Sequence, residues 1–328
     1  MHLTRRNRIL PNVRPIPAPI PTDPDHPRGH PHVAQPVPRR APRRLRSRHR
    51  PAGPVRPLVA PAAAAGTGQV STVTYTAAEQ AAALSYWTPA RMKQVGRDID
   101  LGPTGPLSKP WTGKGIPSIG RLFFSDSRGK DTWCTASAVT SGNRSVIMTA
   151  AHCARLGSSP ANTYSDIVFA PGYAKGKAPY GRYAVKATMT PRSWAEDTVN
   201  DVAAMVVATP ANGKRLTDAV GAQNIAFGRP AGERITTFGY PGTTPQRGEE
   251  LLYCAGTSQR APENEQRVPC DLGGGASGGP WLAGFDSATG KGTVVSVNSH
   301  GEGDGGTPMY GPTLDKTARA AYDAAQRG

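Results

Sequence analysis

A glycine-rich stretch at residues 273–281, GGGASGGPW, constrains this chain most strongly, because it places Ser277 in a tight turn with glycine on both sides. Glycine adopts positive φ easily and has no side chain to keep another backbone away. A serine hydroxyl is a weak nucleophile that needs a base within hydrogen-bond reach and donors for a developing oxyanion. The backbone amides of Gly275 and Ser277 are the predicted donors. The stretch therefore predicts a turn built around a nucleophilic serine.

The base and the acid that such a serine requires are predicted at His152 and Asp201. His152 lies in the motif TAAHC, and five of the seven histidines fall in the first 60 residues, which leaves only His300 as a second candidate. A buried acid that accepts a hydrogen bond from the imidazole fixes its tautomer and stabilises the imidazolium. Asp201 precedes the apolar run 202–207, as expected at the mouth of a buried strand, whereas the alternative, Asp197, lies in a more polar stretch.

The order His152, Asp201, Ser277 differs from the order in subtilisins, and the turn Gly-Ala-Ser-Gly-Gly differs from the G-x-S-x-G elbow of α/β-hydrolases. With the motifs TAAHC, NDVAAMVV and ASGGPW, the chain resembles chymotrypsin-like (trypsin-like) serine peptidases of the bacterial secreted branch, akin to glutamyl endopeptidases, from about Gly115 to its C-terminus. The resemblance implies a monomeric serine endopeptidase that hydrolyses polypeptides through an acyl-enzyme, without a cofactor or metal. The alternative is a catalytically inert protease-like scaffold whose basic tail binds polyanions.

Short strand-like segments follow one another from Ile116 onward, separated by Gly, Pro, Asn and Asp. Such regular turn signals favour an all-β barrel or sandwich. The expected strands are SIGRLFF, TASAVTS, SVIMTA, DIVFA, VAAMVV, ERITTFGY and TVVSVNS, and the alanine-rich residues 314–327 are predicted as a helix. Together with the resemblance, this pattern predicts two six-stranded antiparallel β-barrels with a C-terminal helix and the active site in the cleft.

Four cysteines, at positions 134, 153, 254 and 270, suit two disulfides in an oxidising compartment. The resemblance implies a Cys134–Cys153 bridge, which locks the histidine turn onto the preceding strand, and leaves Cys254 to pair with Cys270. The alternative is four free thiols, but the spacing lacks the C-x-x-C pattern of a metal site.

Residues 1–60 differ sharply in composition from the rest of the chain. They hold 14 of the 33 prolines and 13 arginines against two aspartates, so they carry +11 of the formal net charge of +16. Few apolar side chains are available for burial, so residues 1–70 are predicted to be a disordered tail. Its arginine clusters would attract polyanions weakly, while the simpler alternative is a solvated extension. No clear signal peptide or membrane span is visible, yet the cysteines favour secretion to the extracellular space.

Residues 71–110 are predicted to be a helical pro-segment or, equally, a helical linker that precedes a protease domain at 111–328. Thr76 and Glu79 form a capping box before an alanine-rich helix, and Thr88-Pro89 starts a second short helix that ends near Gly96. The stretch YWTPARM resembles pro-segments of secreted actinobacterial peptidases.

The primary specificity pocket is predicted around Asp271 and residues 298–300. The resemblance places Asp271 at the pocket floor, where a carboxylate would favour Lys or Arg; alternatively, Asp271 turns outward. It also places Asn298, Ser299 and His300 on an edge strand along the substrate, where His300 would favour acidic side chains or lie on the rim. Alternation along that strand puts Ser299 on the opposite face, toward the triad. The sequence therefore allows either a basic or an acidic side chain in the primary specificity pocket, and it indicates nothing about calcium use.

Overall fold

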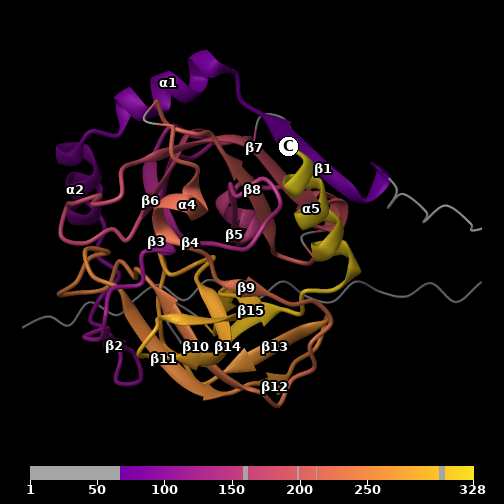
Figure 1. Ribbon diagram of the computed structural model, residues 1–328. Coiled ribbons are helices and arrows are strands. Elements are labelled where there is room, and N and C mark those ends of the chain that lie inside the picture. Colours follow the sequence, from indigo (N-terminus) through magenta and orange to yellow (C-terminus); the bar gives the residue numbers. More distant parts are fainter. Residues whose placement is uncertain (1–66, 158–161, 198, 212, 303–306) are drawn as a thin grey trace, which may run out of the picture. The chain divides into compact units, whose positions relative to one another are not determined.

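The computed structural model describes residues 67–157, 162–197, 199–211, 213–302 and 307–328 (Figure 1). The predicted disorder and polyanion binding of the basic tail fall almost entirely on residues 1–66 and therefore lie outside the described residues. Within the described ranges, none of the helices is long and apolar enough to cross a bilayer.

Six strands in the first half close into a barrel with the order β6-β3-β4-β5-β8-β7, and β7 completes the ring by pairing with both β8 and β6. Buried apolar side chains, among them Leu122, Ile147 and Met205, form a continuous cluster from these strands. The strands are β3 (Ile119–Ser125), β4 (Asp131–Ala138), β5 (Val146–Thr149), β6 (Ser165–Pro171), β7 (Tyr183–Pro191) and β8 (Ala203–Val207).

The second half contains a six-stranded sheet, ordered β2-β11-β10-β14-β15-β9, and a four-stranded sheet, ordered β12-β13-β17-β16. The sheets contact each other where β11 meets β13 and where β15 meets β17. The strands of the larger sheet are β2 (Lys109–Pro110), β9 (Asn224–Ile225), β10 (Arg234–Gly239), β11 (Leu252–Thr257), β14 (Pro280–Asp286) and β15 (Lys291–Val297). Those of the smaller sheet are β12 (Gln259–Arg260), β13 (Glu265–Val268), β16 (His300–Gly301) and β17 (Met309–Pro312).

Five α-helices and two 3-10 turns complete the described elements. The N-terminal ones are η1 (Thr67–Gln69), α1 (Ala77–Tyr86) and α2 (Pro89–Arg97); the others are η2 (Ala151–Cys153), α3 (Arg192–Asp197), α4 (Leu216–Val220) and α5 (Lys316–Arg327). The last of these, α5, is the predicted C-terminal helix; Asp315 caps its first turn, and the helix contacts β7 and β8 of the barrel (Figure 1).

The predicted all-β, chymotrypsin-like class is confirmed, with one difference in detail. The first half closes as a six-stranded barrel, whereas hydrogen bonding in the second half divides its strands between two packed sheets. The strand β9 also pairs in parallel with β15, through Asn224 opposite Thr293 and Ile225 opposite Val294.

Residues 70–110 are closely packed against this framework. Strand β1 (Val70–Thr74) pairs with β7 along its whole length. The predicted capping box between Thr76 and Glu79 begins α1, and Thr88 caps α2 with Pro89 at its first position, as the sequence predicts. Trp87, between the two helices, is fully buried and donates from Nε1 to the Asp166 carbonyl at 2.6 Å. This segment is therefore part of the fold around both halves.

Candidate active site

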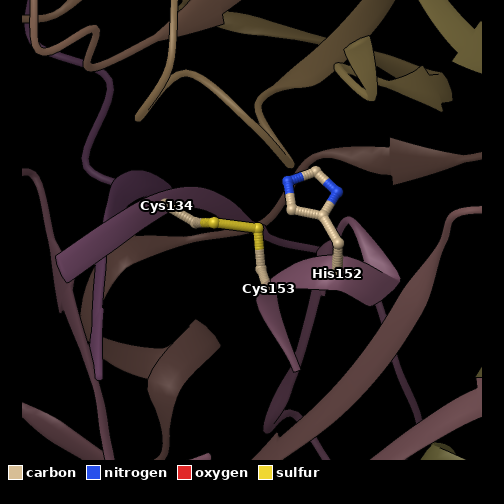
Figure 2. Close-up of side chains that lie close together, drawn as sticks. All are labelled: Cys134, His152 and Cys153. Carbon is tan, nitrogen blue, oxygen red and sulfur yellow. A yellow bond between two sulfur atoms is a disulfide. The ribbon is translucent and has the colours of Figure 1, made fainter. Parts of the chain in front are cut away.

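The short turn that follows β5 carries His152. Strand β5 ends at Thr149, and the 3-10 turn η2 places His152 and Cys153 side by side (Figure 2). Cys153 is bonded to Cys134 on β4, and Cys254 is bonded to Cys270, which is the pairing that the resemblance implies. The first disulfide thus fixes the histidine turn to a barrel strand.

Cys134, His152 and Cys153 also lie within metal-ligand distance of one another, with their donor atoms all within 4.8 Å (Figure 2). Zinc sites use deprotonated thiolates, and here both sulfur atoms are bonded to each other. The cluster is therefore a disulfide beside a histidine and does not fit a metal ion.

Asp201 holds the His152 imidazole in place. Its Oδ2 lies 2.7 Å from His152 Nδ1, and its Oδ1 accepts the His152 backbone amide at 2.9 Å. Ser299 Oγ donates a third hydrogen bond to Asp201 Oδ2 at 2.6 Å. Asp201 is only 7% exposed and lies two residues before β8. The alternative acid, Asp197, ends α3, and its side chain lies outside the described residues.

The two partners shift each other's titration. Burial alone would lower the pKa of His152, but the charge of the Asp201 carboxylate and its hydrogen bond outweigh burial and raise that pKa above the usual value. Burial alone would raise the pKa of Asp201, but His152, Ser299 and the His152 amide together lower it. The pair therefore favours a carboxylate that stabilises an imidazolium.

The nucleophile turn is shaped by two glycines with positive φ. Gly275 has φ of +91°, and a Cβ there would lie 2.7 Å from the Tyr240 carbonyl oxygen. Gly278 has φ of +78°, and a Cβ there would lie 2.0 Å from Thr149 Oγ1. Because Thr149 is the last residue of β5 and stands three residues before His152, this close approach brings the Ser277 turn onto the strand that leads into the histidine turn.

Backbone hydrogen bonds fix the turn and leave two amides free. The Ser277 carbonyl accepts from the Thr135 amide at 2.8 Å, and the Gly278 amide donates to the Asn298 carbonyl at 2.7 Å. Neither the Gly275 amide nor the Ser277 amide donates to another group in the described part of the chain. Two unpaired donors beside a serine hydroxyl are suited to binding an oxyanion.

Ser277 and His152 do not hydrogen-bond to each other in the described ranges. They do lie in adjoining cavities. A cavity of about 350 Å³ is lined by Ser277, and a second cavity is lined by His152 and Asp201. Ser299 and His300 line both cavities. Contacts between a catalytic serine and its base are often long without substrate and shorten when it binds.

The predicted specificity residues are placed differently from one another. Asp271 and His300 both line the cavity next to Ser277, and Ser299 contacts Asp201 there. Asn298 does not line that cavity. It is fully buried, accepts from Thr237 and Trp281 at 2.7 and 2.8 Å, and donates to the Ala276 carbonyl at 3.1 Å. Asn298 therefore stabilises the turn that carries Ser277 from the buried side of that turn.

The sequence does not predict several of the residues that line this cavity, among them Leu101, Pro103 and Gly105. These three come from the stretch between α2 and β2, which the sequence presents only as a pro-segment or linker. No local pattern indicates that this stretch returns to the serine turn more than 170 residues later.

The sequence of residues 113–313, more than half of the chain, matches the family model described as Trypsin. Two solved structures are each 35% identical to the chain. Protease Anisep from Arthrobacter nicotinovorans has a TM-score of 0.61 and covers 67% of this chain and 100% of its own. The thermostable serine protease AL20 from an extremophilic microorganism has a TM-score of 0.60 and covers 65% of this chain and 98% of its own.

A Glu endopeptidase in complex with MPD shares the fold at 19% identity, with a TM-score of 0.55, and covers 67% of this chain and 97% of its own. A comparison with curated proteins gave no match. Because the family model spans well over half of its residues, this chain belongs to the trypsin family and is a serine peptidase.

Proposed function

We propose that this peptidase is an endopeptidase that works through His152, Asp201 and Ser277 and a covalent acyl-enzyme. Ser277 Oγ attacks the scissile carbonyl carbon while His152 Nε2 takes the hydroxyl proton. The C–N bond then breaks, and His152 returns that proton to the leaving amine. Water next attacks the Ser277 ester with His152 again as base, which releases the carboxylate product and restores the serine.

The hydrogen bonding of Asp201 to His152 is the observation that carries this proposal. The 2.7 Å contact at Nδ1 assigns the ring proton to that nitrogen, so that Nε2 is the unprotonated one and can act as the base. The second contact, to the His152 amide, keeps the carboxylate aligned with its own turn. A histidine with a merely structural role would not need its tautomer fixed by a buried acid.

The amides of Gly275 and Ser277 are the proposed donors for the tetrahedral intermediate. Their lack of other acceptors among the described residues supports this role. Removal of one such donor typically slows a protease by a factor of about 100 to 1,000, so the turn would contribute much of the rate enhancement.

We also propose that the enzyme is secreted and that its substrates are polypeptides. The two solved relatives at 35% identity are proteases. Two disulfides, each with a buried or nearly buried pair of cysteines, suit an oxidising compartment. Both features favour a secreted enzyme that acts on polypeptides.

Ser277→Ala tests the proposal directly. Hydrolysis of a protein substrate such as casein should fall by a factor on the order of 10⁶, to near background, because no other group supplies the nucleophile. The matched control is Ser287→Ala, which removes an exposed hydroxyl from the turn after β14 and should leave the rate unchanged. A Ser277→Ala protein that hydrolyses casein at the normal rate would refute the proposal.

A further inference from the structure

Residues 98–108 form a strap that runs from α2 to β2 along the cavity next to Ser277. The Thr104 amide donates to the Thr244 carbonyl at 2.9 Å, and the Thr244 amide donates to the Gly102 carbonyl at 2.7 Å. At the start of the strap, Arg247 Nη2 lies 2.8 Å from Asp100 Oδ2. The strap is thus bonded along its length to the loop that follows β10.

Asp271 anchors the other end of the strap. Its Oδ2 accepts the Leu107 amide and its Oδ1 accepts the Ser108 amide, each at 2.7 Å. The residue is only 7% exposed, and the backbone of Gly105 approaches so closely that a Cβ there would lie 2.2 Å from Asp271 Oδ2. Both carboxylate oxygens therefore already accept hydrogen bonds from the chain itself, and the residue does not turn outward.

His300 is engaged as well. Its Nε2 lies 3.2 Å from both carboxylate oxygens of Glu265, and its ring stacks on Tyr310 with centroids 4.8 Å apart. An acidic substrate side chain would have to compete with a carboxylate that is already in place. Both ionisable side chains among the described residues lining this cavity, Asp271 and His300, thus have partners within the protein.

The remaining large side chains in the cavity wall are apolar: Leu101, Pro103, Leu272 and Met309. Two of them belong to the strap. Leu101 lies against the nucleophile turn, since a Cβ on Gly274 would lie 2.8 Å from Leu101 Cδ1. A strap leucine therefore packs against the turn that carries Ser277.

We infer that the strap is a wall of the primary specificity pocket, that Asp271 is the positioning residue that anchors it, and that the pocket accepts uncharged apolar side chains such as Leu, Met or Phe. This inference rests on the proposed function of Ser277. It replaces both the basic and the acidic preferences that the sequence left open, because Asp271 holds the strap and Glu265 holds His300. It also requires residues 98–108 to remain in the active enzyme.

The test uses the full chain and four otherwise identical chromogenic peptides that carry Leu, Phe, Lys or Glu before the cleaved bond. We expect kcat/KM for the Leu and Phe peptides to exceed that for the Lys and Glu peptides by at least about tenfold, the size of effect that an apolar pocket produces. A Lys peptide cleaved better than the Leu peptide, or a Glu peptide cleaved better, would overturn the inference.

A matched pair of variants isolates the strap. Leu101→Ala and Leu156→Ala make the same change on side chains that are 46% and 47% exposed, but only Leu101 belongs to the strap and lines the cavity. Leu101→Ala should lower kcat/KM for the Leu peptide about tenfold, mostly through KM, and shift the preference toward Phe. Leu156→Ala should stay within about twofold of the wild type on all four peptides. Equal effects of the two variants would contradict a pocket wall at Leu101.

Asp271→Asn separates anchoring from cation binding. The asparagine side chain keeps one acceptor oxygen, so one backbone amide of the strap loses its partner. We therefore expect kcat/KM for the Leu peptide to fall. The small kcat/KM for the Lys peptide should not fall by a larger factor. Selective loss of a high Lys rate would show that Asp271 binds substrate. Labelling of Ser277 by a fluorophosphonate, in the wild type and in each variant, tests the proposed function separately. Absent labelling in the wild type would refute that function. Normal labelling together with a preference for the Lys or Glu peptide would refute only the pocket inference.

Discussion

At the scale of single residues, the candidate site depends on how Asp201 is bonded. The sequence predicts the pairing of His152 with Asp201 because a histidine motif and a strand-mouth acid are both local patterns. It also predicts that Ser299 faces away from Asn298, and Ser299 does contact Asp201 at 2.6 Å. The same alternation places Asn298 and His300 on one face, which is wrong: Asn298 is fully buried and His300 is exposed. Strand periodicity stops at Val297, where β15 ends, and resumes at His300.

The pH dependence follows from the pKa of His152, which must be neutral to act as the base. Asp201 holds that pKa above the usual 6.5, so kcat/KM should decline as the pH falls through an apparent pKa higher than 6.5. A pH profile of kcat/KM with a neutral peptide measures this acidic limb, the range in which kcat/KM declines as the pH falls. A limb centred well below 6.5 would contradict the charge balance described for the pair.

Asp201→Asn should move that limb in the opposite direction. The variant removes the carboxylate charge but leaves the burial that lowers the pKa of His152, so the limb should shift to lower pH. The rate at neutral pH should also fall by a factor of about 10⁴, because the amide favours the wrong imidazole tautomer. The pH profiles of the wild type and the variant, recorded together, check both effects; an unshifted limb would indicate that Asp201 does not control His152.

At the scale of secondary-structure elements, the sequence predicts elements better than it predicts their neighbours. Helix starts at Thr76 and Thr88 are visible because caps are local, and the expected strands around β3, β5 and β8 are present. The sequence does not predict the nine-residue strand β7, since Lys186 and two threonines interrupt its apolar pattern. The packing of residues 70–110 could not be predicted either, because it depends on partners far along the chain.

Trp87 tests whether α1 and α2 belong to the folded enzyme. The ring is fully buried, and its centroid lies 5.1 Å from that of Phe123 on β3. Trp87→Ala should lower the free energy of unfolding by about 3–5 kcal/mol, whereas Trp87→Phe, which keeps a ring but loses the bond to Asp166, should cost about 1–3 kcal/mol. Denaturant unfolding of the full chain measures both. An unchanged transition in Trp87→Ala would favour a pro-segment that folds apart from the barrel.

At the scale of the whole described molecule, the two halves meet around an ion pair between a fully buried arginine and a half-buried glutamate. Arg121 on β3 has a fully buried side chain and contacts Glu249 of the second half at 3.1 Å. Its guanidinium lies 4.1 Å from the centroid of Trp133 and 4.7 Å from that of Tyr173. In the sequence, Arg121 lies within an expected strand, and no local pattern indicates that this arginine faces inward toward the other half.

Glu249 should accordingly be needed for stability. Glu249→Ala leaves the Arg121 charge buried and unpaired, which should cost about 3–5 kcal/mol of unfolding free energy. Replacing both partners, by Arg121→Met together with Glu249→Leu, should recover much of that loss, since an apolar pair carries no desolvation cost. Thermal and denaturant unfolding compare the three proteins. A double variant less stable than Glu249→Ala would show that the charges themselves stabilise the junction.

Covalent labelling shows whether Ser277 is a nucleophile that His152 activates. The full chain is incubated with a fluorophosphonate probe, and the modified residue is located by mass spectrometry, in the wild type and in His152→Ala. We expect a single adduct on Ser277 that forms rapidly in the wild type and is nearly absent in the variant. A folded, disulfide-bonded wild type that stays unlabelled at Ser277 would contradict this expectation and favour an inert protease-like scaffold.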